Sequence, residues 1–410
     1  PVADKPTAVD DLWHAAVNGR GQYFSARSPK EAADGITQAL SDVVSVTGSA
    51  AASATSSPNV TQTDNFIYSS TFQTNLWDGE VTAQRINYQT GAIEDTVEWK
   101  ASDKVNAQAD ALCSKDSNDT CPTGKNRNAR TLLTMDTSAS TYDKSKPFTY
   151  ENLSTAERAW FNNHCTSKEF GQCAENLIDT GRISYVDSAR NVVDFLRGHN
   201  DADVFSVGGL LFGYLDLFRD IRVSRLGDTV NAVPLFISKP QYTFDFALPS
   251  GHEKYKDFIA RVHHTCDLGD TTCNANPPAK RPGVLYMASN DGMLHGFHGD
   301  NGTELFGYIP RTTMPEMWRL ADKNYATHHR YFVDGSPVSM DITSSDGKWK
   351  TILVGGYRSG GSGYYALDVT LDPNDATHSK KPRVLWEVCN DSALCQNPIA
   401  NLGMSFGNPV

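Results

Sequence analysis

The stretch GVLYMASNDGMLHGFHGDNGTELFGYIP (283–310) decides the fold. It contains two apolar runs of strand length, VLYMAS and MLHGFH, and the tripeptide Asn290-Asp291-Gly292 separates them. An Asp-Gly pair between two such runs supplies the positive φ that a tight hairpin turn needs. The stretch therefore predicts a β-hairpin. Asp346-Gly347 predicts a second hairpin, between SMDITSS and KWKTILVGG.

Three segments of the chain share one pattern, over residues 81–99, 294–308 and 364–386. Each is a strand, a polar turn that often contains Thr or Gly, and a strand that ends in an aromatic residue. Units that cannot bury their own faces, repeated at irregular intervals, suit the blades of a β-propeller with inserted loops. Three unrelated hairpins are the alternative. The pattern favours a mainly β chain with a partial propeller.

The cysteines fall in four close couples. Each couple brackets a short polar loop: Cys113 and Cys121, Cys165 and Cys173, Cys266 and Cys273, Cys389 and Cys395. An even count paired locally across loops indicates disulfides formed in an oxidising compartment. Zinc is the rival interpretation, but its sites usually have cysteines only two to four residues apart. We expect four disulfides that pin loop insertions on the surface.

The N-terminal part differs from the rest of the chain. Residues 29–46 predict a helix, with Ser28 as the N-cap, Pro29 in the first turn and apolar residues at helical spacing. The Ala/Ser/Thr-rich tract from Gly48 to Thr63 has the composition of a linker. We therefore expect one domain to end with residues 1–63 and a β domain to occupy residues 64–410.

Charge and hydropathy exclude several classes of function. The net charge is −11 and no Lys/Arg-rich run occurs, which argues against nucleic-acid binding. No run of 18 apolar residues occurs, so we expect no transmembrane helix. Because the chain starts at Pro1, we expect a piece of a longer protein, and the lack of a signal peptide carries no weight.

Metal sites are only weakly indicated. The best acidic clusters for calcium are Asp116/Asn118/Asp119, Asp267/Asp270 and Asp372/Asn374/Asp375. None has the full ligand spacing with a closing Glu, and solvated surface loops or Asx-turns explain them better. The adjacent pairs His263-His264 and His328-His329 point to opposite faces if they lie in strands. His295 and His298 are closer to a plausible pair, but they sit in a predicted hairpin.

Catalytic motifs are missing from the sequence. It has no Gly-x-Ser-x-Gly, no His-Glu-x-x-His and no Cys-x-x-Cys. The glycine-rich stretch 355–363 lacks the Lys-Ser/Thr of a phosphate-binding loop. Asp228 and Asp334, each with a proline several residues further on, are expected to brace the starts of strands. We predict a binding protein rather than an enzyme.

An ordered series of segments resembles the PilC/PilY family of type IV pilus-tip proteins. The segments are RLGDTVNAVPLF (225–236), 283–310, YFVDGSPVSMDIT (331–343), WKTILVGGYRSGGSGYYALDVT (349–370) and LGMSFGNPV (402–410), with FLRG (195–198). Upstream, LWHAAVNGRGQYFSA (12–26) resembles the end of the von Willebrand A-like region of that family. The resemblance covers most of the chain in order.

The resemblance implies a fold and a function. It implies that residues 1–63 end the A-like region and that 64–410 hold the first blades of a propeller similar to quinoprotein alcohol dehydrogenases. It implies export to the cell surface or outer membrane, a place at the pilus tip, binding to minor pilins and to host or abiotic surfaces, and roles in pilus assembly, adhesion and surface sensing. The family's calcium loop is expected beyond residue 410.

Two alternatives stay open. One is a secreted propeller adhesin or scaffold unrelated to pili. The other is a quinoprotein dehydrogenase, which typically uses a vicinal Cys-Cys pair that this chain lacks. Because propellers bind through their loops, we expect partner contacts near the disulfide loops 113–121, 165–173 and 266–273.

Overall fold

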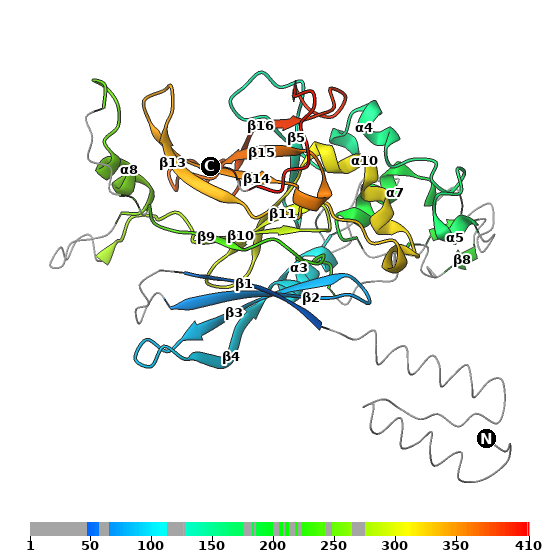
Figure 1. Cartoon of the computed structure of the whole chain (residues 1–410), viewed down its shortest axis with the longest axis horizontal. Coiled ribbons are helices and arrows are strands. Elements are labelled where there is room, and N and C mark those ends of the chain that lie inside the picture. Colours follow the sequence, from blue (N-terminus) through cyan, green and yellow to red (C-terminus); the bar gives the residue numbers. More distant parts are fainter. Residues whose placement is uncertain are drawn as a thin grey trace, which may run out of the picture. The chain divides into compact units, whose positions relative to one another are not determined.

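The structure is a computed structural model (Figure 1) that describes residues 47–56, 65–112, 126, 128–174, 183, 186–199, 205–207, 210–212, 218–219, 224–240, 242, 248–264, 275–407 and 409. The chain divides into two compact units. One comprises Pro1–Thr47 with Gln73–Asn75, and nearly all of it lies outside the described residues. The other comprises Gly48–Phe72 with Leu76–Val410 and holds nearly all of the described residues. The predicted helix 29–46 lies outside the described part.

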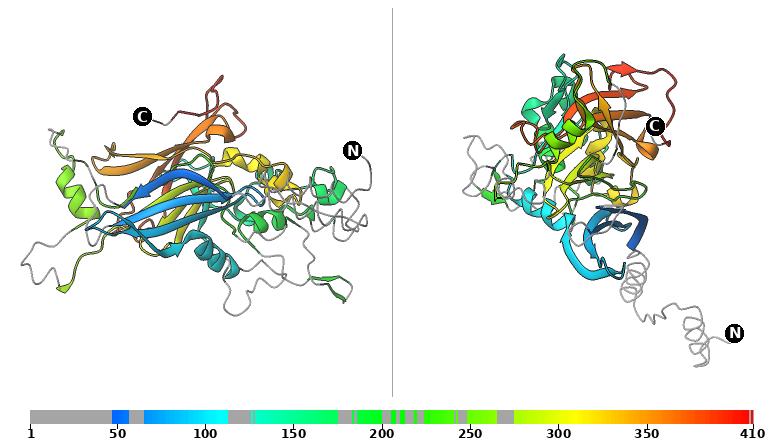
Figure 2. Two further views of the ribbon diagram at one scale, coloured as in Figure 1. Left: turned by 60° about the horizontal axis from the view of Figure 1, so that its bottom comes forward. Right: turned by 90° about the vertical axis from the view of Figure 1, so that its left-hand side faces the viewer.

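The first sheet has the strand order β1-β2-β3-β4. Figure 2 shows these strands, in blue, from two further sides. Their bounds are β1 (Thr47–Thr55), β2 (Phe66–Gln73), β3 (Asp78–Ile86) and β4 (Ile93–Lys100).

The prediction of a linker from Gly48 to Thr63 is wrong for its first half, because β1 lies there. The backbone of Ser56 donates to Phe66 O at 2.9 Å, and the Ser56 hydroxyl accepts from Phe66 N at 2.9 Å. Strands pair through backbone atoms, and whether a segment pairs depends on its neighbours. The Ala/Ser/Thr-rich composition of this tract therefore does not reveal that it forms a strand.

The second sheet has the order β6-β5-β12-β11-β10-β9. Its antiparallel strands are β9 (Leu235–Ile237), β10 (Val284–Ser289), β11 (Met293–His298) and β12 (Glu304–Ile309). Earlier in the chain, β5 (Leu132–Met135) joins β12 in parallel and β6 (Ser145–Pro147) pairs with β5.

The third sheet has the order β13-β14-β15-β16-β17. Four strands are antiparallel neighbours, β13 (Val338–Thr343), β14 (Trp349–Gly356), β15 (Gly363–Asp368) and β16 (Arg383–Cys389), and β17 (Asn397–Pro398) joins β16 in parallel. Both predicted hairpin turns are confirmed. Gly292 joins β10 to β11 with a φ of +89°, and Gly347 joins β13 to β14 with a φ of +76°.

The three similar segments of the sequence occupy the same place in the three sheets. Each is the third and fourth strand in a run of four neighbouring strands, and the two strands pair antiparallel: β3–β4, β11–β12 and β15–β16. A small residue of the third strand pairs with an aromatic residue of the fourth in every case: Ala83 with Trp99, Gly296 with Phe306, and Ala366 with Trp386.

Each of these pairs is followed by a register shift in the ladder. A shift of this kind is a β-bulge, which bends the strand and increases its twist. Successive, similarly twisted meanders are the architecture expected of propeller blades. The mainly β prediction is confirmed, and within the described ranges the strands form open sheets.

Short helices and two further strands fill the connections. They are α3 (Ala101–Asp110), η1 (Tyr150–Asn152), α4 (Thr155–Ala159), α5 (Gly171–Ala174), α7 (Ala189–Leu196), β7 (Phe205–Val207), β8 (Leu210–Phe212), α8 (Tyr255–Val262), η2 (Arg311–Thr313), α10 (Met314–Met317), η3 (Trp318–Ala321), η4 (Tyr325–Thr327) and η5 (Arg358–Gly360). One hydrophobic core joins the sheets with α7 and α10. A second, small core holds Tyr255, Phe258, Val262 and Trp349, and it fixes α8 against β14.

Consecutive sheets also touch through polar contacts. Trp99 Nε1, on β4, donates to Gly299 O beside β11 at 2.8 Å. Arg281 Nη1, just before β10, donates to Thr351 Oγ1 of β14 at 2.8 Å. No described helix is long and apolar enough to cross a membrane.

Two of the four predicted disulfides lie within the described residues. Cys165 joins Cys173 with a Cα–Cα distance of 5.2 Å, and Cys389 joins Cys395 at 5.9 Å. The couples Cys113/Cys121 and Cys266/Cys273 lie outside the described residues.

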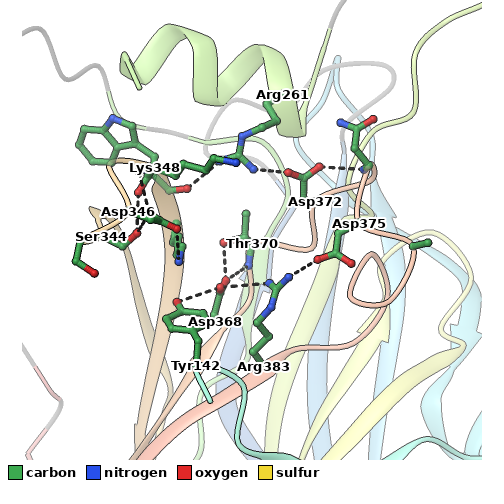
Figure 3. A pocket seen from close by; sticks show the side chains of 15 residues that line it. Tyr142, Arg261, Ser344, Asp346, Lys348, Asp368, Thr370, Asp372, Asp375 and Arg383 are labelled. Atoms are coloured by element: carbon green, nitrogen blue, oxygen red, sulfur yellow. Dashed lines mark hydrogen bonds and ion pairs between the residues drawn. The ribbon is translucent and has the colours of Figure 1, made fainter. Parts of the chain in front are cut away.

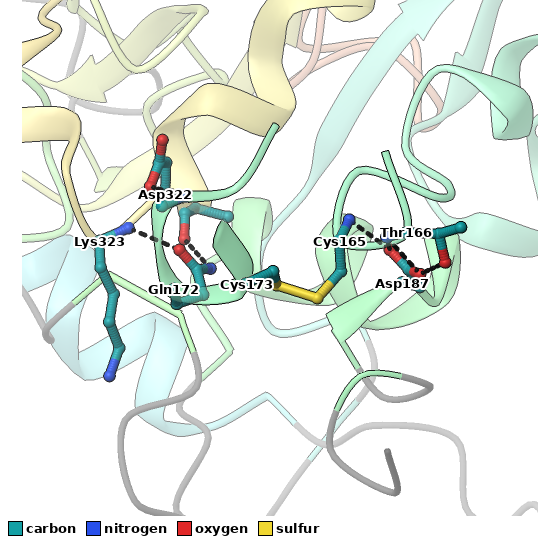
Figure 4. The surroundings of a disulfide bond; sticks show 9 residues. Cys165, Thr166, Gln172, Cys173, Asp187, Asp322 and Lys323 are labelled. Atoms are coloured by element: carbon teal, nitrogen blue, oxygen red, sulfur yellow. Dashed lines mark hydrogen bonds between the residues drawn. A yellow bond between two sulfur atoms is a disulfide. The ribbon is translucent and has the colours of Figure 1, made fainter. Parts of the chain in front are cut away.

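The Cys165–Cys173 loop is anchored more firmly than a simple surface insertion (Figure 4). The Asp187 carboxylate accepts from the Thr166 backbone at 3.0 Å, and Lys323 N donates to Gln172 Oε1 at 3.1 Å. Both cysteines are buried, while residues 166–169 are exposed at the tip. The loop is therefore a fixed platform with a short accessible edge.

Candidate functional site

A polar cleft of about 870 Å³ opens at one end of the third sheet (Figure 3). Segments far apart in the sequence form it: residue 142, α8, the turn between β13 and β14, the segment after β15, and the start of β16. Its lining residues are Tyr142, Arg261, Ser344, Ser345, Asp346, Lys348, Trp349, Lys350, Asp368, Thr370, Asp372, Asn374, Asp375, Ala376 and Arg383.

One wall of the cleft is organised by Arg261 of α8. Its guanidinium contacts both carboxylate oxygens of Glu253, at 2.8 and 3.1 Å, and it also pairs with Asp372. Nη2 of the same group donates to Trp349 O at 2.9 Å. Burial works to lower the pKa of Arg261, but the two carboxylates outweigh it and raise the pKa. The wall is therefore a fixed network around a charged guanidinium.

The floor is organised by Asp368 at the end of β15. Its Oδ1 accepts from Thr370 N at 3.0 Å, and its Oδ2 accepts from the Tyr142 hydroxyl at 3.2 Å. Arg383 lies 3.4 Å from Asp368 Oδ2 and also pairs with Asp375. Burial, followed by the charge of Asp368, raises the pKa of the Tyr142 hydroxyl, which therefore stays protonated as a donor.

The rim is the turn between β13 and β14. Asp346 Oδ1 accepts from Lys348 N at 3.0 Å and from the Ser344 hydroxyl, and Lys350 Nζ lies 3.1 Å from Asp346 Oδ2. Although burial opposes the shift, these hydrogen bonds and Lys350 lower the pKa of Asp346. Lys350 Nζ also lies 3.9 Å from the centre of the Tyr142 ring. The rim is therefore tied to the floor.

The predicted calcium cluster Asp372/Asn374/Asp375 lies beside this cleft as a pair of turns. Asp372 Oδ1 accepts from Asn374 N at 2.9 Å, and Asp375 Oδ1 accepts from Thr377 N at 3.0 Å. Within the described ranges, no group of three or more His, Cys, Asp or Glu side chains is placed to hold a metal ion. The candidates Asp116, Asn118, Asp119, Asp267 and Asp270 lie outside those ranges.

The histidine pairs are separated in the structure. His329 lies against Asp228, with Nε2 at 3.0 Å from Oδ1, and its ring stacks on Trp77 at 3.6 Å. His295 is buried, whereas His298 lies nearer the surface. The structure therefore brings neither of these pairs together as joint metal ligands.

A buried chain of charges in the second sheet was not predicted from the sequence. Arg130 makes two 2.7 Å contacts with Glu304, Glu304 Oε1 lies 2.7 Å from His295 Nδ1, and His295 Nε2 lies 3.0 Å from Asp291. These four side chains are between 0% and 4% exposed. Asp291 is thus more than a turn residue, because its carboxylate also anchors His295.

Burial alone would lower the pKa of His295. The carboxylates of Asp291 and Glu304 outweigh burial and raise it to about 9. Arg130 and His295 in turn hold the pKa of Glu304 well below its usual range, against the effect of burial. Arg130, His295 and Glu304 are therefore charged at neutral pH, and their burial keeps them away from any ligand.

A second buried carboxylate lies where the second and third sheets meet. Glu387 of β16 accepts from the Tyr308 hydroxyl and, at 2.9 Å, from Arg311 N. Burial raises the pKa of Glu387 to about 7. Its Oε2 and the buried hydroxyl of Tyr365 make no hydrogen bond with the described residues.

The expectation that Asp228 and Asp334 brace strand starts agrees with their contacts. Asp228 Oδ2 accepts from Asn290 Nδ2 at 2.6 Å, and Asp334 Oδ2 accepts from Asn231 Nδ2 at 2.8 Å. Asn290 Oδ1 also accepts from Phe332 N at 3.0 Å. Asn290, in the turn between β10 and β11, thus holds both the segment that precedes the second sheet's β9 and the segment that precedes the third sheet's β13.

Comparison with known proteins agrees with this architecture. Residues 226–410 match the family of the PilY1 beta-propeller domain. They contain the complete third sheet and the four-stranded meander of the second. The class that the fold and the match define is a propeller-bearing protein of type IV pili.

Curated relatives extend the match over nearly the whole chain. Type IV pilus biogenesis factor PilY1 of Pseudomonas aeruginosa strain UCBPP-PA14 is 29% identical over 99% of this chain and 29% of its own length. The same factor of strain PAK is 30% identical over 98% of this chain and 29% of its own length. A PilY1 homolog of Xylella fastidiosa is 30% identical over 61% of this chain and 17% of its own length. Residues 226–410 thus belong to the PilY1 beta-propeller family, and the chain is similar to PilY1 pilus biogenesis factors over nearly its whole length.

The chain spans about 29% of the length of the Pseudomonas relatives. Among solved structures, the C-terminal domain of Pseudomonas aeruginosa PilY1 is 35% identical over 34% of this chain and 24% of that chain, with a TM-score of 0.23.

Proposed function

We propose that this chain is part of an exported, non-enzymatic protein of the type IV pilus tip. Such a protein would support pilus assembly, adhesion and surface sensing by binding minor pilins and host or abiotic surfaces. The observation that carries the proposal is the match to PilY1 pilus biogenesis factors over 98–99% of the chain. The location that fits this role is the cell surface, reached through the periplasm.

The arrangement of charged groups supports binding rather than catalysis. The chain Arg130–Glu304–His295–Asp291 resembles a proton relay in composition, but its side chains are at most 4% exposed and have no access to substrate. In the cleft, both Arg261 and Arg383 are held between carboxylates. A general acid or base needs a pKa near the working pH and contact with the substrate proton. Arginines that are held in fixed ion pairs do not meet these conditions, which favours a binding role for the cleft.

Calcium and the contact loops remain part of the proposal. We assign calcium to the full-length protein, at a site outside the described residues. The exposed tip at residues 166–169, on its anchored disulfide platform, is a suitable contact for a minor pilin because its geometry is fixed before binding.

The proposal is tested by complementing a deletion strain of the source organism. One strain receives the full-length protein and another receives the same protein without residues 226–410. Surface pili are counted by electron microscopy, and export of both proteins is checked by immunoblot. We expect pili only with the intact protein.

Normal piliation by the truncated protein would contradict a role for this propeller in assembly. Normal piliation with lost adhesion would favour the alternative of an adhesin that acts independently of pili.

A further inference from the structure

The charge balance of the cleft limits what it can bind. Its lining carries the cations Arg261, Lys348, Lys350 and Arg383 and the anions Asp346, Asp368, Asp372 and Asp375, which sum to zero. Each of the four carboxylates already lies within ion-pair distance of a cation of the lining. A strongly charged ligand would have to compete with these fixed pairs, whereas a neutral one would not.

The rim offers polar groups that are still available. The side chains of Lys348, Asn374 and Ser345 are exposed and make no hydrogen bond or ion pair with other described residues. Together they provide ammonium and amide donors and amide and hydroxyl acceptors, and the neighbouring carboxylates keep unused lone pairs. Closely spaced donors and acceptors complement a molecule whose hydroxyl groups both donate and accept.

The cleft also has an aromatic platform. Tyr142 is 48% exposed, and two contacts fix its ring: its hydroxyl donates to Asp368, and the Lys350 ammonium lies over one face, 3.9 Å from the ring centre. The opposite face is the one left for a ligand. The face of an aromatic ring is electronegative and attracts weakly positive C–H groups. The C–H faces of pyranose rings carry such groups. Trp349 cannot serve in this way, because it is 3% exposed and belongs to the small core.

We propose that this cleft is a binding site for a neutral carbohydrate, with the ring of Tyr142 as its platform and Lys348 and Asn374 as its hydrogen-bonding rim. The volume of about 870 Å³ lies within the range of roughly 300–1,000 Å³ found for small-molecule sites. The inference rests on the proposed adhesive function and names the class of ligand. The fixed ion pairs of the walls and the held ring of Tyr142 lose little conformational entropy on binding, so only the rim side chains have to be ordered.

The site is tested with the purified chain on an array of immobilised neutral and acidic oligosaccharides, followed by titration of the best ligand. Tyr142→Ala removes the platform, and Tyr88→Ala is the matched control, because Tyr88 is 49% exposed and does not line the cleft. We expect binding of neutral glycans that weakens about tenfold or more in Tyr142→Ala and is unchanged in Tyr88→Ala.

Two further variants protect the test against misfolding. Tyr142→Phe keeps the ring and is expected to retain most of the affinity, and Asn374→Ala changes only an exposed rim residue and is expected to weaken binding several-fold. Binding of acidic glycans only, no glycan binding, or equal affinities of the Tyr142→Ala and Tyr88→Ala variants would overturn the proposal. Piliation is measured separately with Tyr142→Ala, so that loss of the carbohydrate site is distinguished from failure of pilus assembly.

Discussion

The second and third sheets use the same kinds of side chain in opposite ways. In the second sheet, Arg130 and His295 meet Glu304 at 2.7 Å in a fully buried chain. In the third sheet, Arg261 and Arg383 meet carboxylates at the wall of an open cleft. Because the first set is buried, no ligand or partner protein can contact it, and each side chain depends on the others to compensate its charge. The arginines of the second set are partly exposed, at 22% and 21%, and their ion pairs form walls of the cleft beside the groups that are still available to a ligand.

The comparison separates a structural role from a binding role. Removing one member of a buried ion pair leaves an uncompensated charge and costs about 3–5 kcal/mol, whereas an exposed pair contributes about 0–1 kcal/mol. The buried chain should therefore govern stability, and the cleft should govern recognition. Mutations in the two places allow the distinction to be measured directly.

The largest effect is expected from Glu304→Ala. The substitution leaves Arg130 and His295 buried without their shared carboxylate, and we expect the free energy of unfolding to fall by about 3–5 kcal/mol. Chemical denaturation followed by intrinsic fluorescence measures the change. A loss below about 1 kcal/mol would show that the buried chain is not the main anchor of this sheet.

The buried groups also predict how stability depends on pH. The pKa of His295 is raised to about 9 in the folded chain, so its contribution is present in full below about 6.5 and is lost as the pH rises through about 9. The pKa of Glu387 is raised to about 7, so the folded chain favours its protonated form, and stability falls as the pH rises from about 4.5 to 7.

Thermal melts between about pH 4.5 and 9.5 separate these two contributions. We expect Glu387→Gln to flatten the dependence below about pH 7 and His295→Gln to flatten it between about pH 6.5 and 9. The same pH dependence in both variants and the parent chain would contradict the assignment of charge states to these groups.

A smaller effect is expected from Gly296→Ala. A Cβ atom at this position would lie 2.5 Å from Phe306 Cε1, so the buried Phe306 ring must move to admit it. Overpacking of this kind costs about 1–3 kcal/mol. Gly403→Ala is the control, because a Cβ there meets nothing within 4 Å. Equal denaturation midpoints for the two variants would show that the small–aromatic pairing is not required.

The smallest effect on stability is expected from Asp372→Asn in the cleft. Arg261 keeps Glu253 as a partner, and the pair with Asp372 is partly exposed, so we expect a loss of about 0–1 kcal/mol. The same denaturation assay measures it. A loss as large as that of Glu304→Ala would remove the distinction between the two regions.

Local patterns were enough to predict much of the third sheet. The Asp346-Gly347 turn and the strand that opens the segment 364–386 depend only on neighbouring residues, and both correspond to observed elements. The prediction of a strand pair in each of the three similar segments is confirmed for the same reason, because a strand, a turn and a strand are contiguous in sequence. The capping box of Ser154 and Glu157 is another local feature, and it begins α4.

Long-range contacts could not be predicted in this way. Arg130 lies 174 positions before its partner Glu304, and no spacing rule links them. β5 joins β12 in parallel from a distant part of the chain, and the cleft combines Tyr142 with α8 and β16. Met293, His295 and Phe297 lie two positions apart in β11, so a strand places their side chains on one face, and this spacing was an available signal that His295 points inward.

The central claim, that this chain is part of a pilus-tip protein, is tested most directly by co-purification. The full-length protein and the chain of residues 1–410 are each tagged and mixed with the minor pilins of the same organism, with and without calcium. The account predicts that the full-length protein retains the minor pilins, and retention by the shorter chain would place a contact within it. Retention by neither protein, with or without calcium, would contradict the account.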